Sequence, residues 1–335
     1  MFNESDGDSD PTSPNNYTRD HLFTMLVLAV TFLVGVPGNI LVLWVTGVKM
    51  KRTVTTVWFW NLALADITCC LSLPCSFVQF FYQEWLYGPV ICKILPSIVI
   101  LNMSASIFTL VAISIDRCIL VVRPVWAQNH RSLRMAWLVC LVIWMLSFLM
   151  CLPVFIYRET FLFNNITKCI YKYYLYSHDE YLAISYAITY TRMTFAFLFP
   201  LVIISACYIR LTLTVHNTRF VKEGRKTTKV VFSIIVAFFV TWAPYHIIGI
   251  ILLYDGSRAV IILDGVSQAL AYSNSCINPI LYVFMGKDFK SKLRQSLYRQ
   301  VESVFREETI TRSTEHSRNE TTILDSAANI TGSYL

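Results

Sequence analysis

Two charged side chains stand inside stretches of the sequence that otherwise hold no charge. Asp66 is the one charged residue in residues 54–82, and Arg192 is the one in residues 184–209. Apolar stretches of this length are typical of membrane helices, in which an ionisable group is costly and normally faces a protein interior or a water-filled cavity. Both side chains are therefore candidates for functional sites.

Asp66 has candidate partners in other apolar stretches. Carboxylate, amide and hydroxyl oxygens are the ligands that hard cations prefer, so a sodium ion bound at Asp66 is one interpretation. A hydrogen-bonded polar cluster without an ion is the other, and the spacing alone favours neither. The side chains expected around Asp66 are Asn102, Ser106, Asn274 and Asn278.

Arg192 belongs with two further charges that lie near the ends of apolar stretches. Arg158 follows the stretch 135–157, and Asp264 directly precedes the stretch 265–286. Guanidinium groups suit a carboxylate, and a carboxylate suits a cation. The three side chains are thus candidates for binding a charged ligand. The competing interpretations are a solvated loop position for Arg158 and an internal ion pair for Arg192.

A bundle of membrane helices must position these residues. The 335-residue chain is 55% hydrophobic and only 15% charged, which is too apolar for a soluble domain of this size. Five stretches without any charge, and the two that hold Asp66 and Arg192, are each long enough to cross a bilayer. The predicted fold class is an all-α membrane protein with seven transmembrane helices. The five uncharged stretches are residues 22–48, 94–115, 135–157, 230–254 and 265–286.

Basic residues near the ends of these stretches predict the orientation. Lysine and arginine gather in the loops on the cytoplasmic side, and this placement explains the net charge of +7 without a nucleic-acid partner. The N-terminus is therefore expected outside the cell and the C-terminus inside. Residues 1–20 lack the pattern of a cleaved leader, so we expect the first helix to direct insertion. The basic residues after the first, third and fifth stretches include Lys49, Lys51, Arg52, Arg123, Arg131, Arg134, Arg210 and Arg219.

The extracellular side carries two further kinds of signal. Of the ten cysteines, only Cys92 and Cys169 fall in positions exposed to an oxidising compartment, which predicts a disulfide between them. Three N-x-S/T sequons on extracellular segments predict glycosylation at Asn3, Asn16 and Asn165.

The composition divides the chain into four segments. Residues 1–21 form an acidic extracellular tail, and residues 22–285 hold the seven helices. Residues 286–300 have the amphipathic pattern of an interfacial helix that lies on membrane lipid. Residues 301–335 form a cytoplasmic tail rich in phosphorylatable serine and threonine.

Motifs along the seven stretches, taken in order, resemble the rhodopsin-type family of G-protein-coupled receptors. They are Asn39, LALAD ending at Asp66, the segment from Cys92 to Arg117, Trp144, Pro200, Trp242-Ala243-Pro244 and Asn278-Pro279-Ile280-Leu281-Tyr282. The resemblance covers residues 22–300. It implies a receptor, not an enzyme, that needs no cofactor and activates a heterotrimeric G protein, and the sodium ion at Asp66 stays one of two interpretations.

The resemblance also implies which residues switch the receptor. Arg117 is expected to pair with Asp116 in the inactive state and to turn toward the G protein in the active state. Receptor kinases and arrestin are implied as partners of the phosphorylated tail. The remaining switch residues implied by the family's motifs are Ile107, Pro200, Tyr208, Phe238, Trp242, Pro279 and Tyr282.

Longer segments resemble the complement anaphylatoxin receptors within this family. They include GVPGNILVLWVTGVKMKRTVTTVWF, RPVWAQNHR and NSCINPILY. The resemblance implies a ligand that ends in arginine, whose carboxylate meets Arg192 and Arg158 and whose guanidinium meets Asp264. It also implies a multi-pass plasma-membrane receptor that acts in chemotaxis and inflammation through an inhibitory-type G protein.

The resemblance leaves alternatives for the ligand. GKDF at 286–289 and TRST at 311–314 favour component 3a, whereas the short connection at 157–183 departs from the long second loop of the mammalian receptors for that component. Component 5a, or another chemoattractant peptide, is the alternative ligand. A scavenger that removes an anaphylatoxin without signalling is the alternative function.

Overall fold

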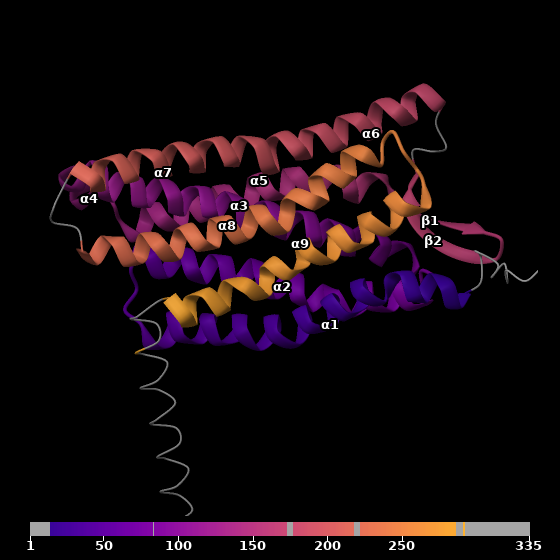
Figure 1. Cartoon of the computed structure of the whole chain (residues 1–335), viewed down its shortest axis with the longest axis horizontal. Coiled ribbons are helices and arrows are strands. Elements are labelled where there is room, and N and C mark those ends of the chain that lie inside the picture. Colours follow the sequence, from indigo (N-terminus) through magenta and orange to yellow (C-terminus); the bar gives the residue numbers. More distant parts are fainter. Residues whose placement is uncertain (1–13, 83, 173–176, 218–221, 286–290, 292–335) are drawn as a thin grey trace, which may run out of the picture. The chain divides into compact units, whose positions relative to one another are not determined.

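The computed structural model describes residues 14–82, 84–172, 177–217, 222–285 and 291. Within these residues, long helices run alongside one another, as the prediction of an all-α membrane protein requires (Figure 1). A π-helical turn at Thr194–Leu198 joins α6 and α7 into one rod, so that seven rods of membrane length are present. The helices are α1 (Pro14–Trp44), α2 (Val54–Tyr82), α3 (Gly88–Val122), α4 (Pro124–His130), α5 (Leu133–Tyr157), α6 (His178–Met193), α7 (Phe199–Asn217), α8 (Lys222–Ile251) and α9 (Arg258–Met285).

Several helices extend beyond the uncharged stretches that predict them. By length and hydropathy alone, 5 helices in the described part of the chain qualify as membrane spans, while α8 contributes a shorter apolar segment, Ile235–Ile251. The helices α3 and α8 both begin before their uncharged stretch, because a charged side chain ends an apolar run without ending a helix. Likewise, α1 begins at Pro14, within the segment assigned to the tail.

A β-hairpin and a short helix lie at opposite ends of the bundle (Figure 1). The hairpin consists of β1 (Arg158–Phe163) and β2 (Ile166–Tyr171), which pair antiparallel with Phe163 opposite Ile166. Its two turn residues, Asn164 and Asn165, have φ values of 48° and 61°, a left-handed conformation that asparagine tolerates and that two-residue hairpin turns require. The predicted glycosylation site Asn165 is therefore exposed at the hairpin tip.

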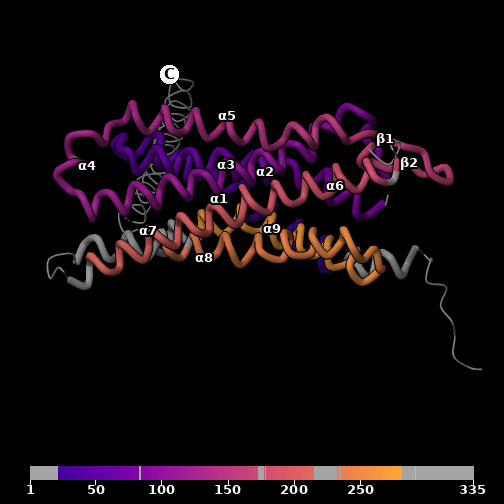
Figure 2. The backbone as a smooth tube through the Cα atoms, turned by 90° about the horizontal axis from the view of Figure 1, so that it is seen from above, coloured from indigo at the N-terminus to yellow at the C-terminus, as the bar shows by residue number. Residues whose placement is uncertain are grey.

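Helix α3 is the helix around which the others are arranged. It packs against α2, α5 and α7, and Figure 2 shows it between α5 on one side and α8 and α9 on the other. Buried hydrogen bonds fasten these neighbours: Asn61 of α2 donates to Thr109 Oγ1 of α3 at 2.7 Å and accepts from Trp144 Nε1 of α5 at 2.9 Å. Because buried polar groups must be satisfied, this network fixes the relative register of three helices.

The predicted disulfide between Cys92 and Cys169 is present and ties β2 to the start of α3. Both cysteines are buried in a cluster with Trp85. A second link is the ion pair between Lys93 and Glu159, with 3.0 Å between Nζ and Oε2. The hydrogen bond from Lys93 holds the pKa of Glu159 below its usual value, so the pair persists until the pH falls through that lowered pKa.

Replacing both disulfide cysteines with serine is expected to lower thermal stability, because the bridge closes a loop with a sequence separation of 77. The chain-entropy relation gives about 4 kcal/mol for a loop of this length, an upper value here because the unfolded chain stays in the membrane. Thermal unfolding of the solubilised receptor measures the loss. Cys75→Ser, which removes a free thiol, is the control. An unchanged melting temperature of the double variant would contradict the prediction.

Candidate functional site

Arg192 lies in the last turn of α6, and its head group is held by Tyr245 of α8. Its Nη1 donates to the Tyr245 hydroxyl at 2.6 Å, and the guanidinium carbon lies 4.7 Å from the centre of the Tyr245 ring. Its Nε is buried and has no hydrogen-bond partner among the described residues. The predicted cation is therefore fixed in place by an aromatic neighbour and retains an unused donor.

Arg158 is the first residue of β1 and belongs to the hairpin rather than to a solvated loop. Its Nη1 donates to the backbone oxygen of Cys169 at 2.8 Å, and its guanidinium lies 4.3 Å from the ring centre of Tyr171. The strand register places Arg158 directly opposite Tyr171. The hairpin and the disulfide thus position this second cation.

Asp264 completes the set from α9. It accepts a hydrogen bond from Gln268 Nε2 at 2.7 Å, and among the described residues it forms no ion pair within 4.0 Å. Arg192 and Arg158 both lie within electrostatic range of its carboxylate. The structure therefore brings the three predicted charges, from α6, β1 and α9, into one region near the hairpin end of the bundle.

The structure brings only some of the side chains predicted around Asp66 into contact with it. Asp66 is buried and accepts from Asn278 Nδ2 at 2.7 Å and from Ser106 Oγ at 3.4 Å. Asn102 instead contacts another residue of α2, Thr68, whose hydroxyl donates to the Asn102 Oδ1 at 3.2 Å. The Oδ1 atoms of Asn274 and Asn278 are buried without a described hydrogen-bond partner. One acceptor beside Asp66, the Oδ1 of Asn278, is therefore buried without a described donor.

The implied switch residues in the middle of the bundle are buried, and two of them are in ring contact. Phe238 and Ile107 are fully buried, and the rings of Phe238 and Trp242 stack with 5.8 Å between their centres. Pro200 and Pro279 are also buried. The side chain of Tyr282 lies outside the described part of the structure.

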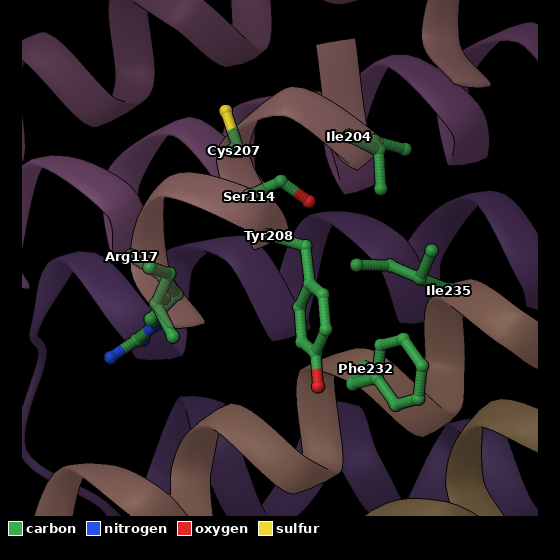
Figure 3. Close-up of a pocket in the computed structure, with 8 residues that line it drawn as sticks. Ser114, Arg117, Ile204, Cys207, Tyr208, Phe232 and Ile235 are labelled. Carbon is green, nitrogen blue, oxygen red and sulfur yellow. The ribbon is translucent and has the colours of Figure 1, made fainter. Parts of the chain in front are cut away.

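Arg117 lies near the opposite end of the bundle from the hairpin. It lines a small pocket with Tyr208, and Figure 3 shows the Tyr208 ring beside that of Phe232, with Arg117 on the other side. Arg117 Nε is 3.9 Å from Asp116 Oδ2, the limit of an ion pair, while its Nη2 donates to Thr55 Oγ1 at 2.6 Å. The implied pairing of Arg117 with Asp116 is therefore weak in this structure.

Several residues of these sites are not singled out by the sequence analysis. Tyr245 directly follows the Trp242-Ala243-Pro244 motif, which is the one signal in the sequence that points to it. Cys118 lies within hydrogen-bond reach of the Cys207 thiol on α7, which gives the residue after Arg117 a packing role. The others are Gln268 beside Asp264, Tyr171 beside Arg158, Thr55 beside Arg117 and the buried His246 above Trp242.

Some predicted residues lie outside the described part of the chain. Asn3 and the segments 1–13, 286–290 and 292–335 are among these, so the sequon, the interfacial helix and the phosphorylatable tail stay predictions. Asn16 falls within α1, but its side chain is not described. Apart from Tyr282, the other site residues considered above lie within 55–279.

In the described part of the chain, seven membrane-length rods carry a charged region at one end and an arginine near the other, the arrangement expected of a transmembrane receptor. The family model described as "7 transmembrane receptor (rhodopsin family)" matches residues 38–282. The chain therefore belongs to the rhodopsin family of seven-transmembrane receptors and is a receptor rather than an enzyme.

Individual relatives within this family are anaphylatoxin receptors by name. The chain is 43% identical over 305 residues to the C3a anaphylatoxin chemotactic receptor of Oncorhynchus mykiss, covering 89% of this chain and 83% of that protein. It is 42% identical over 314 residues to the receptor of the same name from Danio rerio, covering 92% and 85%. It is also 42% identical over 320 residues to the C5a anaphylatoxin chemotactic receptor 1 of Oryctolagus cuniculus, covering 92% and 90%.

Proposed function

We propose that the chain is a plasma-membrane receptor for a complement anaphylatoxin, with component 3a favoured, and that it activates an inhibitory-type G protein in chemotaxis and inflammation. The observation that carries the proposal is the grouping of Arg192, Arg158 and Asp264, in which neither sign of charge is neutralised by an ion pair among the described residues. Partly buried charges without close partners are unfavourable, so such a site favours a ligand that brings both opposite charges.

A C-terminal arginine has both of these charges. Its carboxylate would accept from the unused Nε of Arg192 and from Arg158, while its guanidinium would donate to Asp264. Tyr245 and Gln268 would hold the two receptor groups in place before the ligand arrives, which lowers the entropy lost on binding. The hairpin would cover the ligand, because Arg158 belongs to it.

The signal would pass from this region through the packed centre to Arg117. Trp242 lies one helical turn below Tyr245 and His246, in ring contact with both, and stacks on Phe238. A ligand that moves Tyr245 would therefore shift this aromatic stack, and α8 with it. The stacked pair of Tyr208 and Phe232 joins α7 to α8 beside Arg117, where a G protein would bind.

Sequence similarity alone does not decide whether component 3a or component 5a is the ligand. The Oncorhynchus and Danio relatives named for C3a and the rabbit relative named for C5a have nearly equal identity to this chain. The alignment with the human C3a receptor extends over 460 positions, more than the 335 residues of this chain, which agrees with a much shorter connection between α5 and α6 here.

The deciding experiment exposes membranes that contain the receptor to components 3a and 5a side by side and measures binding and nucleotide exchange on an inhibitory-type G protein. We expect exchange stimulated by 3a at lower concentrations than by 5a. Higher potency of 5a would reassign the ligand. Tight binding of either without exchange would instead support a scavenger, and no binding of either would overturn the proposal.

A sodium ion at Asp66 is a further part of the proposal, and the residues fit one. The Asp66 carboxylate and the unpartnered Oδ1 of Asn278, whose Nδ2 donates to that carboxylate, are hard oxygen ligands, buried where a cation would offset the charge of the carboxylate. The ion would stabilise the inactive arrangement of α2, α3 and α9, since these helices supply Asp66, Ser106 and Asn278.

Sodium is therefore expected to lower agonist affinity. In the unmodified receptor, replacing N-methylglucamine chloride with sodium chloride at equal ionic strength should weaken agonist binding about 5-fold, a common size for allosteric coupling. Asp66→Asn should abolish this difference, because an amide gives the ion no negative charge. Radioligand binding in the two salts measures the effect, and a sodium response that survives in the variant would contradict the assignment.

The proposed receptor function also predicts the orientation of the chain and the partners of its C-terminal segments. The hairpin end of the bundle would face outward, which places Asn165 where a glycan can be attached and the N-terminus outside the cell. Receptor kinases and arrestin would act on residues 301–335, and the amphipathic segment 286–300 would rest on membrane lipid.

A further inference from the structure

Asp116 has a stronger partner than its neighbour Arg117. Arg131, the residue that directly follows the short helix α4, donates to both carboxylate oxygens, with 2.7 Å from Nε to Oδ1 and 3.1 Å from Nη2 to Oδ2. The side chain of Asp116 is only 9% exposed. Two-point pairing of this kind is the strongest geometry that a guanidinium and a carboxylate can adopt. Arg131 therefore occupies the carboxylate that Arg117 would otherwise use.

Arg117 is correspondingly left with only a weak ion pair to Asp116. Its Nε is 3.9 Å from Asp116 and, although buried, has no hydrogen-bond partner among the described residues. Its one described hydrogen bond goes to the hydroxyl of Thr55 on α2, and Arg131 donates to the same oxygen at 3.1 Å. A neutral hydroxyl holds a cation less firmly than a carboxylate does. Arg117 is thus positioned by a group that it can leave at small cost.

We infer that Arg131 is a positioning residue for G-protein activation: by holding Asp116, it keeps Arg117 on Thr55 and ready to engage the G protein. The inference rests on the G-protein activation proposed above. It differs from the implied switch, in which Arg117 is released from Asp116 itself. Here the ion pair of Asp116 joins α3 to the end of α4, and the release of Arg117 breaks a bond to α2.

This arrangement predicts that replacing Arg131 and replacing Asp116 have opposite effects on how easily Arg117 is released. Without Arg131, Asp116 retains Arg117 as its nearest cation, so Arg117 should turn to it and become harder to release. Without the charge of Asp116, no carboxylate is left to hold Arg117, which should be freer. A pair that served folding alone would give losses of the same sign for both substitutions.

The test measures ligand-free nucleotide exchange on an inhibitory-type G protein at matched receptor amounts. We expect Arg131→Ala to lower exchange about threefold and Asp116→Asn to raise it about threefold, within the range of coupling between contacting residues. The double variant should behave as Asp116→Asn, because Arg131 acts through that carboxylate.

Arg134→Ala, which removes an exposed positive charge three residues further on, is the matched control and should leave exchange unchanged. Exchange in Arg131→Ala at or above the unmodified level, or additive effects in the double variant, would overturn the inference.

A second measurement needs no G protein and so separates this inference from the proposed function. Double-mutant cycles by thermal unfolding of the full receptor, with Arg117→Ala and Asp116→Asn, report how strongly these two residues interact. We expect little coupling in the unmodified background and a clear coupling once Arg131 is alanine. Equal coupling in both backgrounds would reject the positioning role, even in a receptor that activates no G protein.

Discussion

Replacing Asp264 with alanine is expected to lower the affinity for an anaphylatoxin that ends in arginine by about 100-fold, since truncating one partner of a buried charge pair weakens binding strongly. In the free receptor, Gln268 holds one carboxylate oxygen at 2.7 Å, and no described cation lies within ion-pair distance. A ligand guanidinium would therefore meet a carboxylate already oriented toward it. Competition binding with components 3a and 5a measures the loss.

A ligand trimmed of its terminal arginine separates this pairing from a general loss of structure. The unmodified receptor should prefer the full ligand strongly, whereas the Asp264→Ala receptor should bind full and trimmed ligands nearly alike. Asp264→Asn, which retains an acceptor for Gln268, should resemble the alanine variant because the charge is what matters. Asp179→Ala removes an exposed acid from the first turn of α6 and is the matched control. An Asp264→Ala receptor that still preferred the full ligand as strongly would show that the guanidinium binds elsewhere.

The sequence predicts the helices and the buried charges for the same physical reason. A charge within a long apolar stretch is costly unless it has a partner, so Asp66 and Arg192 could be assigned to the interior before any contact was known. Cys92 and Cys169 could be paired because the other cysteines lie away from the oxidising side. In each case the membrane restricts the side chain to one environment, so the residue type is enough to predict where the side chain lies.

The partners of side chains that lie one turn apart on the same helix face could not be distinguished from the sequence. Asn102 and Ser106 are four residues apart on α3, yet Ser106 reaches Asp66 while Asn102 binds Thr68. Arg131 is one of many basic residues in the loops, and in the sequence it indicates only orientation. Its pairing with Asp116 depends on the turn at Arg123 between α3 and α4, which brings residues 15 apart together. The sequence does not predict the hairpin, because two short strands give little periodic signal, although the Asn164-Asn165 pair is typical of its turn.

Replacing Arg192 with alanine should lower ligand affinity about 30-fold, because the ligand carboxylate would lose a buried, charged donor. Tyr245→Phe keeps the ring beneath the guanidinium but removes the hydroxyl that holds Nη1 at 2.6 Å, so we expect a smaller loss of about 5-fold. Binding of the same anaphylatoxin to both variants measures these effects.

An amidated ligand isolates the role of Arg192. Amidation removes the carboxylate charge but leaves the arginine side chain, so it should weaken binding to the unmodified receptor and change little in Arg192→Ala. The Asp264 variants should respond to amidation as the unmodified receptor does, since they affect the other end of the same residue. If amidation weakened binding equally with and without Arg192, the carboxylate would belong to another cation, and Arg158, fixed by the hairpin, is the candidate that the geometry supplies. Two ligand changes and two receptor changes thus assign each charge of the terminal arginine to its own partner.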